Sequence, residues 1–379
     1  MQERPLSSTT LPLSQLPKAP VRQRTFVLAR ALFGLLAVLA TAIGGAFLLH
    51  ASIDPAEDTA IASIRHEALA GLDTWSDRSQ SANVADVATS LVDLVVVDPA
   101  PSGVVDAGSL AARVNALAVK PDGDKRLVLA SLTIGEAEDH RASWNNWWNK
   151  PPQVTAVVRR PGNQDAQAAA AGKPADSGAS RLVGSALPPA PLPTWLADEV
   201  SERPGNWRVR YWMADWQSLL MGSEGSMLDQ ILTARFDGVV LDRGDVHAHW
   251  AKQHPDARTD MISLVETLAR YAREKVPGFI VVLKDADDLL DTTRIRKAVD
   301  AVIKQDLLFG PDGLARLAND RDMATRIALL KRAQRDGLPV MIAEYPADEP
   351  SIAVARDRLL AHGFVPHLGQ RPDKRRPVD

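Results

Sequence analysis

The sequence predicts an α/β protein: a closed (β/α)8 barrel preceded by a single N-terminal transmembrane helix. Three observations lead to this fold class: eight short β-branched runs, helix-period segments between most of them, and a charge-free apolar run near the N-terminus. Alternating strands and helices are typical of a parallel sheet, and eight such repeats favour closure into a barrel. A doubly wound open sheet is the alternative. No Gly-rich phosphate-binding fingerprint follows the first strand, which weakens a dinucleotide-binding version of that fold.

The apolar run covers residues 31–49 and carries no charge over 19 positions. A helix needs about 20 residues to cross a bilayer. Arginines precede the run and acidic residues follow it, which predicts a cytoplasmic N-terminus. We therefore expect a disordered cytoplasmic tail at 1–25 and a signal anchor at 26–50. A cleaved signal peptide is the alternative, but the apolar segments of such peptides are usually about 7–15 residues long.

This arrangement places the protein in the inner (cytoplasmic) membrane as a single-pass chain, with its C-terminal domain periplasmic or extracellular. The barrel domain is expected at 60–371 and is interrupted by an Ala-, Gly-, Pro- and Ser-rich segment at 161–193, which predicts a flexible insertion. A short run at 72–75 is a ninth strand candidate. The eight predicted strands are residues 94–98, 127–132, 207–212, 237–242, 279–283, 299–304, 340–345 and 364–368.

Composition excludes several classes of function. None of the 379 residues is a cysteine, so disulfides, thiolate metal sites and a cysteine nucleophile are excluded. The formal net charge is −3, which gives no sign of a nucleic-acid partner. With 45% hydrophobic residues the chain is able to bury a sizeable core. We expect no cofactor and no metal.

Acidic residues recur where the predicted strands end, which is the end of a barrel that carries its chemistry. A ring of acids is typical of a site that binds a cation, a metal or an amino sugar, or that breaks a glycosidic bond. Glycoside hydrolysis needs two carboxyls, one ionised and the other protonated. A strand-end acid also often caps a helix or pairs with an arginine; Asp237, which begins its strand, is expected only to order a turn. The predicted exits carry Asp98, Glu136, Glu138, Trp212, Asp242, Asp285, Gln305, Asp306, Glu344 and His367.

Histidines and tryptophans add two further signals. His247 and His249 follow Asp242 and Asp245. These residues leave open a further class of function, a divalent-metal enzyme such as a deacetylase, although no third ligand beside the two histidines is evident.

The chain has nine tryptophans and only three tyrosines. Flat aromatic faces suit sugar rings, yet ordinary packing explains most tryptophans in a barrel. We expect two or three of them to line the cleft.

Five segments together resemble one family. In chain order they are LVVVDP, LASLTIGEAEDHRASW, VRYWMADWQSLL, FDGVVLDRGDV and GFVPHLGQR, and the resemblance covers roughly residues 72–371. They resemble the barrel family of endo-α-1,4-polygalactosaminidases, glycoside hydrolase family 114. The resemblance implies cleavage of a galactosamine-rich exopolysaccharide by a pair of carboxylic acids, and hence an amino-sugar polysaccharide as partner.

Carried over residue by residue, the resemblance implies that Asp242 is one of the catalytic pair. It places four other residues in or beside the cleft and matches Asp245 to the next acid of the same motif. The four are Asp98, Glu136, Glu138 and Arg141.

Two positions depart from the family pattern. Gln305, in QDLLFG, stands where the family carries a Glu, and LKDAD has Lys284 and Asp285 where the family tends to carry Gln and Asn. An amide cannot donate a proton as a carboxylic acid does. We therefore expect the proton donor to be Glu136 or Asp306, and the alternative is a polysaccharide-binding barrel without catalysis.

The predicted site follows from these considerations. Catalytic residues are expected to be Asp242, Asp306 and Glu136. Substrate-binding residues are expected to be Asp98, Glu138, Arg141, Trp212, Asp245, Asp285, Gln305 and Glu344.

Overall fold

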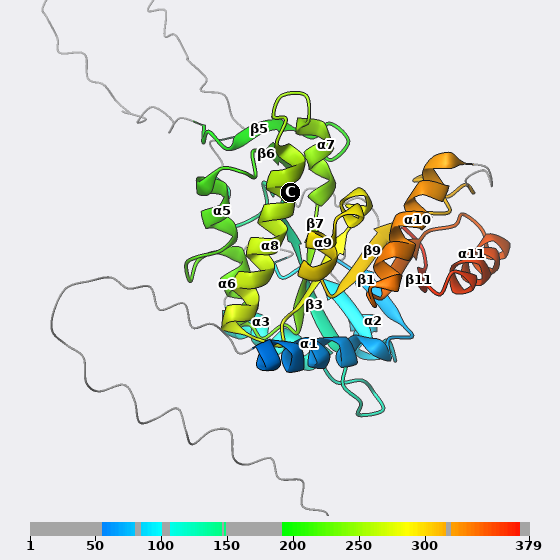
Figure 1. Cartoon of the computed structure of the whole chain (residues 1–379). Coiled ribbons are helices and arrows are strands. Elements are labelled where there is room, and N and C mark those ends of the chain that lie inside the picture. The colour runs from blue at the N-terminus through cyan, green and yellow to red at the C-terminus, as the bar shows by residue number, and fades with distance from the viewer. Residues whose placement is uncertain are drawn as a thin grey trace, which may run out of the picture. The chain divides into compact units, whose positions relative to one another are not determined.

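Eight parallel strands form one sheet that is nearly closed into a barrel (Figure 1). Each pair of neighbours in the sheet is parallel, as expected when helical crossovers connect the strands. In sheet order the strands are β1 (Trp75–Arg78), β2 (Leu94–Val97), β3 (Leu127–Thr133), β7 (Gly238–Asp242), β8 (Ile280–Lys284), β9 (Ala301–Gln305), β10 (Val340–Glu344) and β11 (Val365–Leu368).

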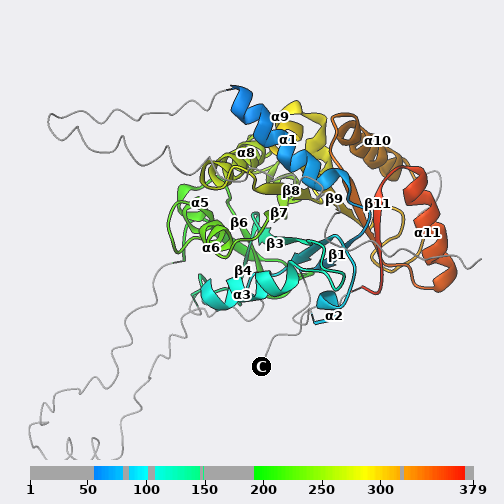
Figure 2. The ribbon, with the colours of Figure 1, turned by 90° about the horizontal axis from the view of Figure 1, so that it is seen from below.

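Helices lie around these strands, as Figure 2 shows. They are α2 (Ala85–Ala88), α3 (Ala107–Leu117), α5 (Ala214–Leu220), α6 (Met227–Thr233), α7 (His247–Trp250), α8 (Ala257–Lys275), α9 (Thr293–Ala298), α10 (Arg321–Arg335) and α11 (Glu349–Ala361). Two 3-10 helices, η1 (Gly244–Val246) and η2 (Asp287–Asp291), follow β7 and β8. The predicted (β/α)8 barrel is confirmed.

The computed structural model describes residues 55–79, 85–100, 107–145, 148, 192–315 and 320–371. The predicted tail at 1–25, the predicted membrane helix at 26–50 and all but the last two residues of the predicted insertion at 161–193 lie outside these ranges. Within the ranges, no helix has the length and apolar character needed to cross a membrane.

One predicted barrel strand was wrong. Of residues 207–212, only the beginning is extended, and it belongs to β6 (Asn206–Val209) in a separate antiparallel sheet. That sheet also contains β4 (Glu136–Glu138) and β5 (Leu196–Glu199). The eighth barrel strand is instead β1, which begins at the end of the ninth candidate, residues 72–75.

The barrel is closed by side chains between β1 and β11. The indole N–H of Trp75 donates to the carbonyl of Val365 at 2.9 Å, and the Trp75 ring lies 5.4 Å from the ring of His367. One end of the barrel is covered by α1 (Pro55–Ala70), which crosses below the sheet in Figure 1. Leu69 from this helix joins the cluster inside the barrel, and Arg65 donates to the Asp300 carboxylate.

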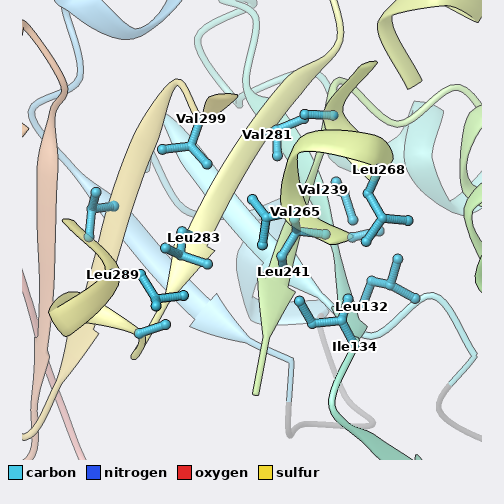
Figure 3. Packing of buried hydrophobic residues seen from close by; sticks show 14 of the residues in the cluster. Leu132, Ile134, Val239, Leu241, Val265, Leu268, Val281, Leu283, Leu289 and Val299 are labelled. Carbon is cyan, nitrogen blue, oxygen red and sulfur yellow. The ribbon is translucent and has the colours of Figure 1, made fainter. Parts of the chain in front are cut away.

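Each barrel strand contributes alternate residues to two separate cores. Val240 and Val282 belong to the inner cluster, whereas Val239 and Leu241 belong to the outer one. Strands buried on both faces are expected to be apolar at every position, as β7 is up to its last residue. Figure 3 shows Val239 and Leu241 of β7 packed beside the α8 side chain Val265. By the same alternation, Asp242 and Lys284 point into the barrel.

Candidate active site at the barrel mouth

Three consecutive strands end in the same unusual way. Arg243, Asp285 and Asp306 directly follow β7, β8 and β9, and their φ angles are +66°, +59° and +57°. Left-handed backbone at residues other than glycine typically costs about 1–3 kcal/mol and clusters at functional sites. Here it turns the chain sharply just after Asp242 and Lys284, whose side chains face the barrel interior.

A buried lysine joins two acids across the barrel. Lys284 Nζ lies 3.0 Å from Asp77 Oδ2 and 3.3 Å from Asp242 Oδ2. The three residues are buried, and β1 and β8 are not neighbours in the sheet, so this bridge runs through the interior. Asp77 also accepts from the backbone N–H and the hydroxyl of Ser79.

This bridge sets the charge of the central carboxyl. Burial alone would raise the pKa of Asp242, but the charges of Lys284 and Arg243 outweigh it. The backbone N–H of Arg243 donates to Asp242 Oδ1 at 2.7 Å, and the pKa falls to about 2. The same balance lowers the pKa of Asp77 and raises that of Lys284. Asp242 is therefore a fixed carboxylate at neutral pH.

Glu136 lies beside Asp242 but is held by cations. Its carboxylate is 2% exposed, pairs with Arg203 and accepts from the Asn206 amide at 3.1 Å. Arg243 Nε lies 3.9 Å from Glu136 and 3.9 Å from Asp242, so it connects the two acids. Both oxygens of the Glu136 carboxylate are thus occupied by donors from the protein.

The second glutamate and the arginine of the GEAE-x-x-R motif form a network with Asp98. Arg141 donates to Glu138 Oε2 at 2.7 Å and to Asp98 Oδ1 at 2.6 Å. Asp98 also accepts from the backbone N–H of Ala100 at 2.8 Å. The arginine therefore links β4 to the end of β2.

Asp306 lies where the chain turns after β9, so it is not constrained to the outer face of that strand. Its carboxylate binds Arg371 through both oxygens, at 2.6 and 3.1 Å. Arg371 in turn lies 4.6 Å above the Tyr345 ring. Gln305 Nε2 is 3.5 Å from Asp306 Oδ2. The predicted substitute acid is thus close to Gln305 but carries a bidentate arginine.

Two other predicted ligands have structural partners outside the barrel. Asp285 Oδ1 accepts from Lys304 Nζ and from the backbone N–H of Gln305, both at 2.9 Å. Glu344 has no exposed surface and accepts from the backbone N–H groups of Leu308 and Phe309. Burial raises the pKa of Glu344 to about 7, against these two hydrogen bonds. Glu344 orders the segment after β9.

Trp212 lies beyond β6 rather than at a barrel strand exit. Its ring stacks on His254 at 4.1 Å and meets Tyr211 and Trp250 edge-on. The other described tryptophans pack mainly into the outer core, where Trp144, Trp195 and Trp216 are at most 9% exposed. A shallow pocket next to Glu136, Glu138 and Arg141 is lined by Trp144, Trp148, Trp195 and Trp216. Trp147 lies outside the described residues.

Asp245 sits on η1, two residues after the turn at Arg243. Its side chain is exposed. Burial of its inner part raises the pKa of Asp245; Arg243 opposes this, and the charges of Asp242, Asp285 and Glu136 add to it. The site therefore contains one carboxyl with a lowered pKa and, on the same loop, one with a raised pKa.

The structure does not gather the candidate metal ligands. His247 Nε2 lies 2.9 Å from Asp288 Oδ2, on the neighbouring 3-10 helix. In the part of the chain that the structure describes, no three His, Asp or Glu side chains are grouped as a metal ion requires.

Sequence reasoning missed the contribution of Asp77, Arg203 and Arg371. The sequence gives little indication that Asp77 lies in a barrel strand, because WSDR is rich in polar residues that are untypical of buried strands. Arg203 and Arg371 lie in loops and reach the site from far along the chain. Lys284 stood out only as a departure from the family pattern.

Gly135 lets the loop after β7 pack closely on β3. A Cβ at this position would lie 2.3 Å from the Arg243 carbonyl and 2.4 Å from a Val246 methyl. We expect Gly135→Ala to push η1 outward and to lower the free energy of unfolding by about 1–3 kcal/mol. Urea unfolding and amide hydrogen exchange at residues 243–246 measure both effects. Gly71→Ala, with nothing within 4 Å of the new methyl, is the matched control, and equal losses in the two variants would contradict the prediction.

The chain has sequence relatives in other organisms. No protein-family model matches it. It is 26% identical over 310 residues to an uncharacterized protein of Methanocaldococcus jannaschii, covering 78% of this chain and 75% of that protein. It is 27% identical over 288 residues to an uncharacterized protein of Deinococcus radiodurans, covering 75% of each.

Among solved structures, the chain is similar to Aspergillus fumigatus Ega3 in complex with galactosamine, with a TM-score of 0.45 and 14% identity, covering 79% of this chain and 92% of that one. It is also similar to the glycoside hydrolase domain of PelA from Pseudomonas aeruginosa, with a TM-score of 0.49 and 14% identity, covering 80% of this chain and 97% of that one.

Proposed function

We propose that the protein is a membrane-anchored glycoside hydrolase that cleaves an α-linked, galactosamine-rich exopolysaccharide. Asp242 carries this proposal. It is a buried carboxylate, held ionised by Lys284 at the exit of a barrel strand, and it occupies the motif position of a catalytic acid in the family that the sequence resembles. A fixed carboxylate of this kind is what glycoside hydrolysis uses to oppose positive charge at the anomeric carbon.

The charge around Asp242 supports an amino sugar as the substrate. Arg243, which directly follows Asp242, interacts with the charges of Glu136 and Asp245 as well as with that of Asp242. Partly deacetylated galactosamine polymers are cationic, so a mouth with several acids attracts them.

Gln305 favours a second function, a polysaccharide-binding barrel without catalysis. It ends β9 with its side chain on the inner face, where the resembled family carries a Glu. The neighbouring Asp306 is held by both nitrogens of Arg371. If no other group supplies the proton, the barrel binds the polymer and does not cut it.

A reducing-end assay separates the two functions. The full-length chain would be offered a partly deacetylated α-1,4-galactosamine polymer, with an α-1,4-glucan as the neutral control. New reducing ends from the first polymer alone are expected. Binding without cleavage, with cleavage gained in Gln305→Glu, would support the binding barrel instead. A chain that neither binds nor cleaves the cationic polymer would contradict both.

We also propose that the barrel is held at the periplasmic or extracellular side of the inner membrane. The support is the uncharged run at 31–49 with basic residues before it and acidic residues after it. Protease digestion of intact and of permeabilised cells tests this: a barrel that is cut only after the inner membrane is opened would contradict the placement.

A further inference from the structure

The carboxyls around the barrel mouth differ in what they bind. Asp98 and Glu138 share Arg141, and Glu136 binds Arg203. The remaining pairs are Asp77 and Asp242 with Lys284, Asp285 with Lys304, and Asp306 with Arg371. Each of these acids is therefore engaged by a cationic side chain of the protein.

Asp245 is the exception in this set. Its carboxyl makes no hydrogen bond or ion pair with any residue that the structure describes. Asp245 is exposed to solvent, so a polymer can reach it. The loop that carries it is fixed, because Arg243 turns the chain after β7 and the loop packs without a gap on Gly135. Asp245 is therefore both accessible and held near Asp242.

We propose that Asp245 is the proton donor that replaces the family acid missing at Gln305. This inference rests on the glycoside hydrolase function proposed above and names a catalytic residue for it. The geometry favours Asp245 over Asp306 and Glu136, because those two carboxyls are occupied by arginines.

The charges that face Asp245 suit a donor. Asp242 ends β7, Asp285 follows β8 and Glu136 lies on β4; these three acids favour the protonated form of Asp245. The charge of Arg243 opposes them, and the pKa of Asp245 is raised on balance. Two carboxyls whose environments push their pKa values apart are typical of an acid and its partner carboxylate.

The reaction balances with water as the only other reactant. The Asp245 O–H proton moves to the glycosidic oxygen as the bond between that oxygen and the anomeric carbon breaks. Asp242 opposes the charge at this carbon, as nucleophile or as stabilising carboxylate. Water then bonds to the anomeric carbon, and its released proton returns to Asp245. One glycosidic bond and one water give two hydroxyl groups.

Leaving-group dependence tests this role. Wild type and Asp245→Asn, both full length, would be assayed on the galactosamine polymer and on the 2,4-dinitrophenyl α-glycoside of a short galactosamine oligomer. The dinitrophenolate leaves without protonation, so it does not need the donor. Asp245→Asn is expected to lose about 10²–10⁴-fold on the polymer and less than tenfold on the aryl glycoside. The fall in wild-type activity as the pH rises through the pKa of Asp245 is expected to be absent for the variant on the aryl glycoside.

Asp256→Asn, an exposed acid that precedes α8, is the control and is expected to keep both rates. An unchanged polymer rate in Asp245→Asn, or equal losses on both substrates, would overturn the role of Asp245. The same signature in Asp306→Asn or Glu136→Gln would assign the donor to that residue instead. A wild type that cleaves neither substrate would overturn the proposed function itself, an outcome distinct from a wild type whose cleavage survives Asp245→Asn.

Discussion

Lys284→Met is expected to lower the free energy of unfolding at pH 7 by roughly 3–5 kcal/mol, because two buried carboxylates lose their shared cation. Asp77 and Asp242 both have lowered pKa values in the folded protein. Their contribution to wild-type stability is therefore present above about pH 4, the value for an unfolded Asp, and is lost as the pH falls toward 2.

The variant is expected to show the opposite dependence on pH. Without Lys284, burial dominates at both acids and their folded-state pKa values rise above the unfolded one. Protonation then relieves the buried charge, so the loss caused by Lys284→Met is largest at pH 7 and shrinks toward pH 4. Urea unfolding of wild type and variant across this range measures it.

Two matched variants control this prediction. Adding Asp77→Asn to Lys284→Met removes one uncompensated acid and is expected to restore part of the loss. Lys304→Met also removes a lysine from between two acids, but Asp287 keeps Arg326 and Asp285 keeps the Gln305 N–H. Its cost should be smaller. Equal costs at Lys284 and Lys304, or a loss that grows on acidification, would contradict a central role for the Asp77–Lys284–Asp242 bridge.

Asp242→Asn is expected to lower polymer cleavage by at least about 10³-fold while binding of the polymer is kept. The amide keeps the shape of the side chain but loses the charge that opposes the developing positive centre. Unlike Asp245→Asn, it is expected to lose the aryl glycoside activity as well, because that reaction still needs the carboxylate. Reducing-end release and polymer pull-down on the full-length chain measure the two effects.

The same strand offers a matched control. Asp237 directly precedes β7, where it binds Lys125 at 2.7 Å and accepts from the Val128 N–H at 2.9 Å. Asp237 therefore has a structural role, but it connects β7 to β3 rather than ordering a local turn as expected from the sequence. Asp237→Asn should leave cleavage within about twofold of wild type, since the substituted acid is remote from the mouth. Comparable losses at positions 237 and 242 would mean that general destabilisation, rather than chemistry, explains the result.

The sequence predicts seven of the eight barrel strands because strands buried on both faces are apolar at consecutive positions. The wrong prediction of a barrel strand at residues 207–212 has a physical cause. WRVRYW alternates bulky and charged residues, which suits an antiparallel strand with one wet face, and β6 lies in such a sheet. WSDR is the converse case: its polar residues hide a barrel strand, because Asp77 is neutralised inside the barrel by a lysine 207 positions away.

The candidate site was predictable to a similar degree. The rule that functional residues lie at the ends of barrel strands identifies Asp242, because side chains alternate between the two faces of a strand and this shows which of the last residues points inward. It fails for Asp285 and Glu344, because the strand exit does not reveal on which face of the sheet an acid lies. It also cannot show which acids are paired. Arg203 and Arg371 reach Glu136 and Asp306 from loops, and only the folded chain identifies Asp245 as the carboxyl left unpaired.

The side-chain closure between β1 and β11 has a consequence for folding during synthesis. Trp75 and Val365 are 290 residues apart, so the first strand of the barrel emerges from the ribosome long before its partner exists. At about 5–20 residues per second, that delay is roughly 15–60 s. For this period β1 has a free edge, but it is only 4 residues long, and short edges pair poorly with other chains. We therefore expect the barrel to assemble from β2 onward and to close last, when the Trp75 indole binds the Val365 carbonyl.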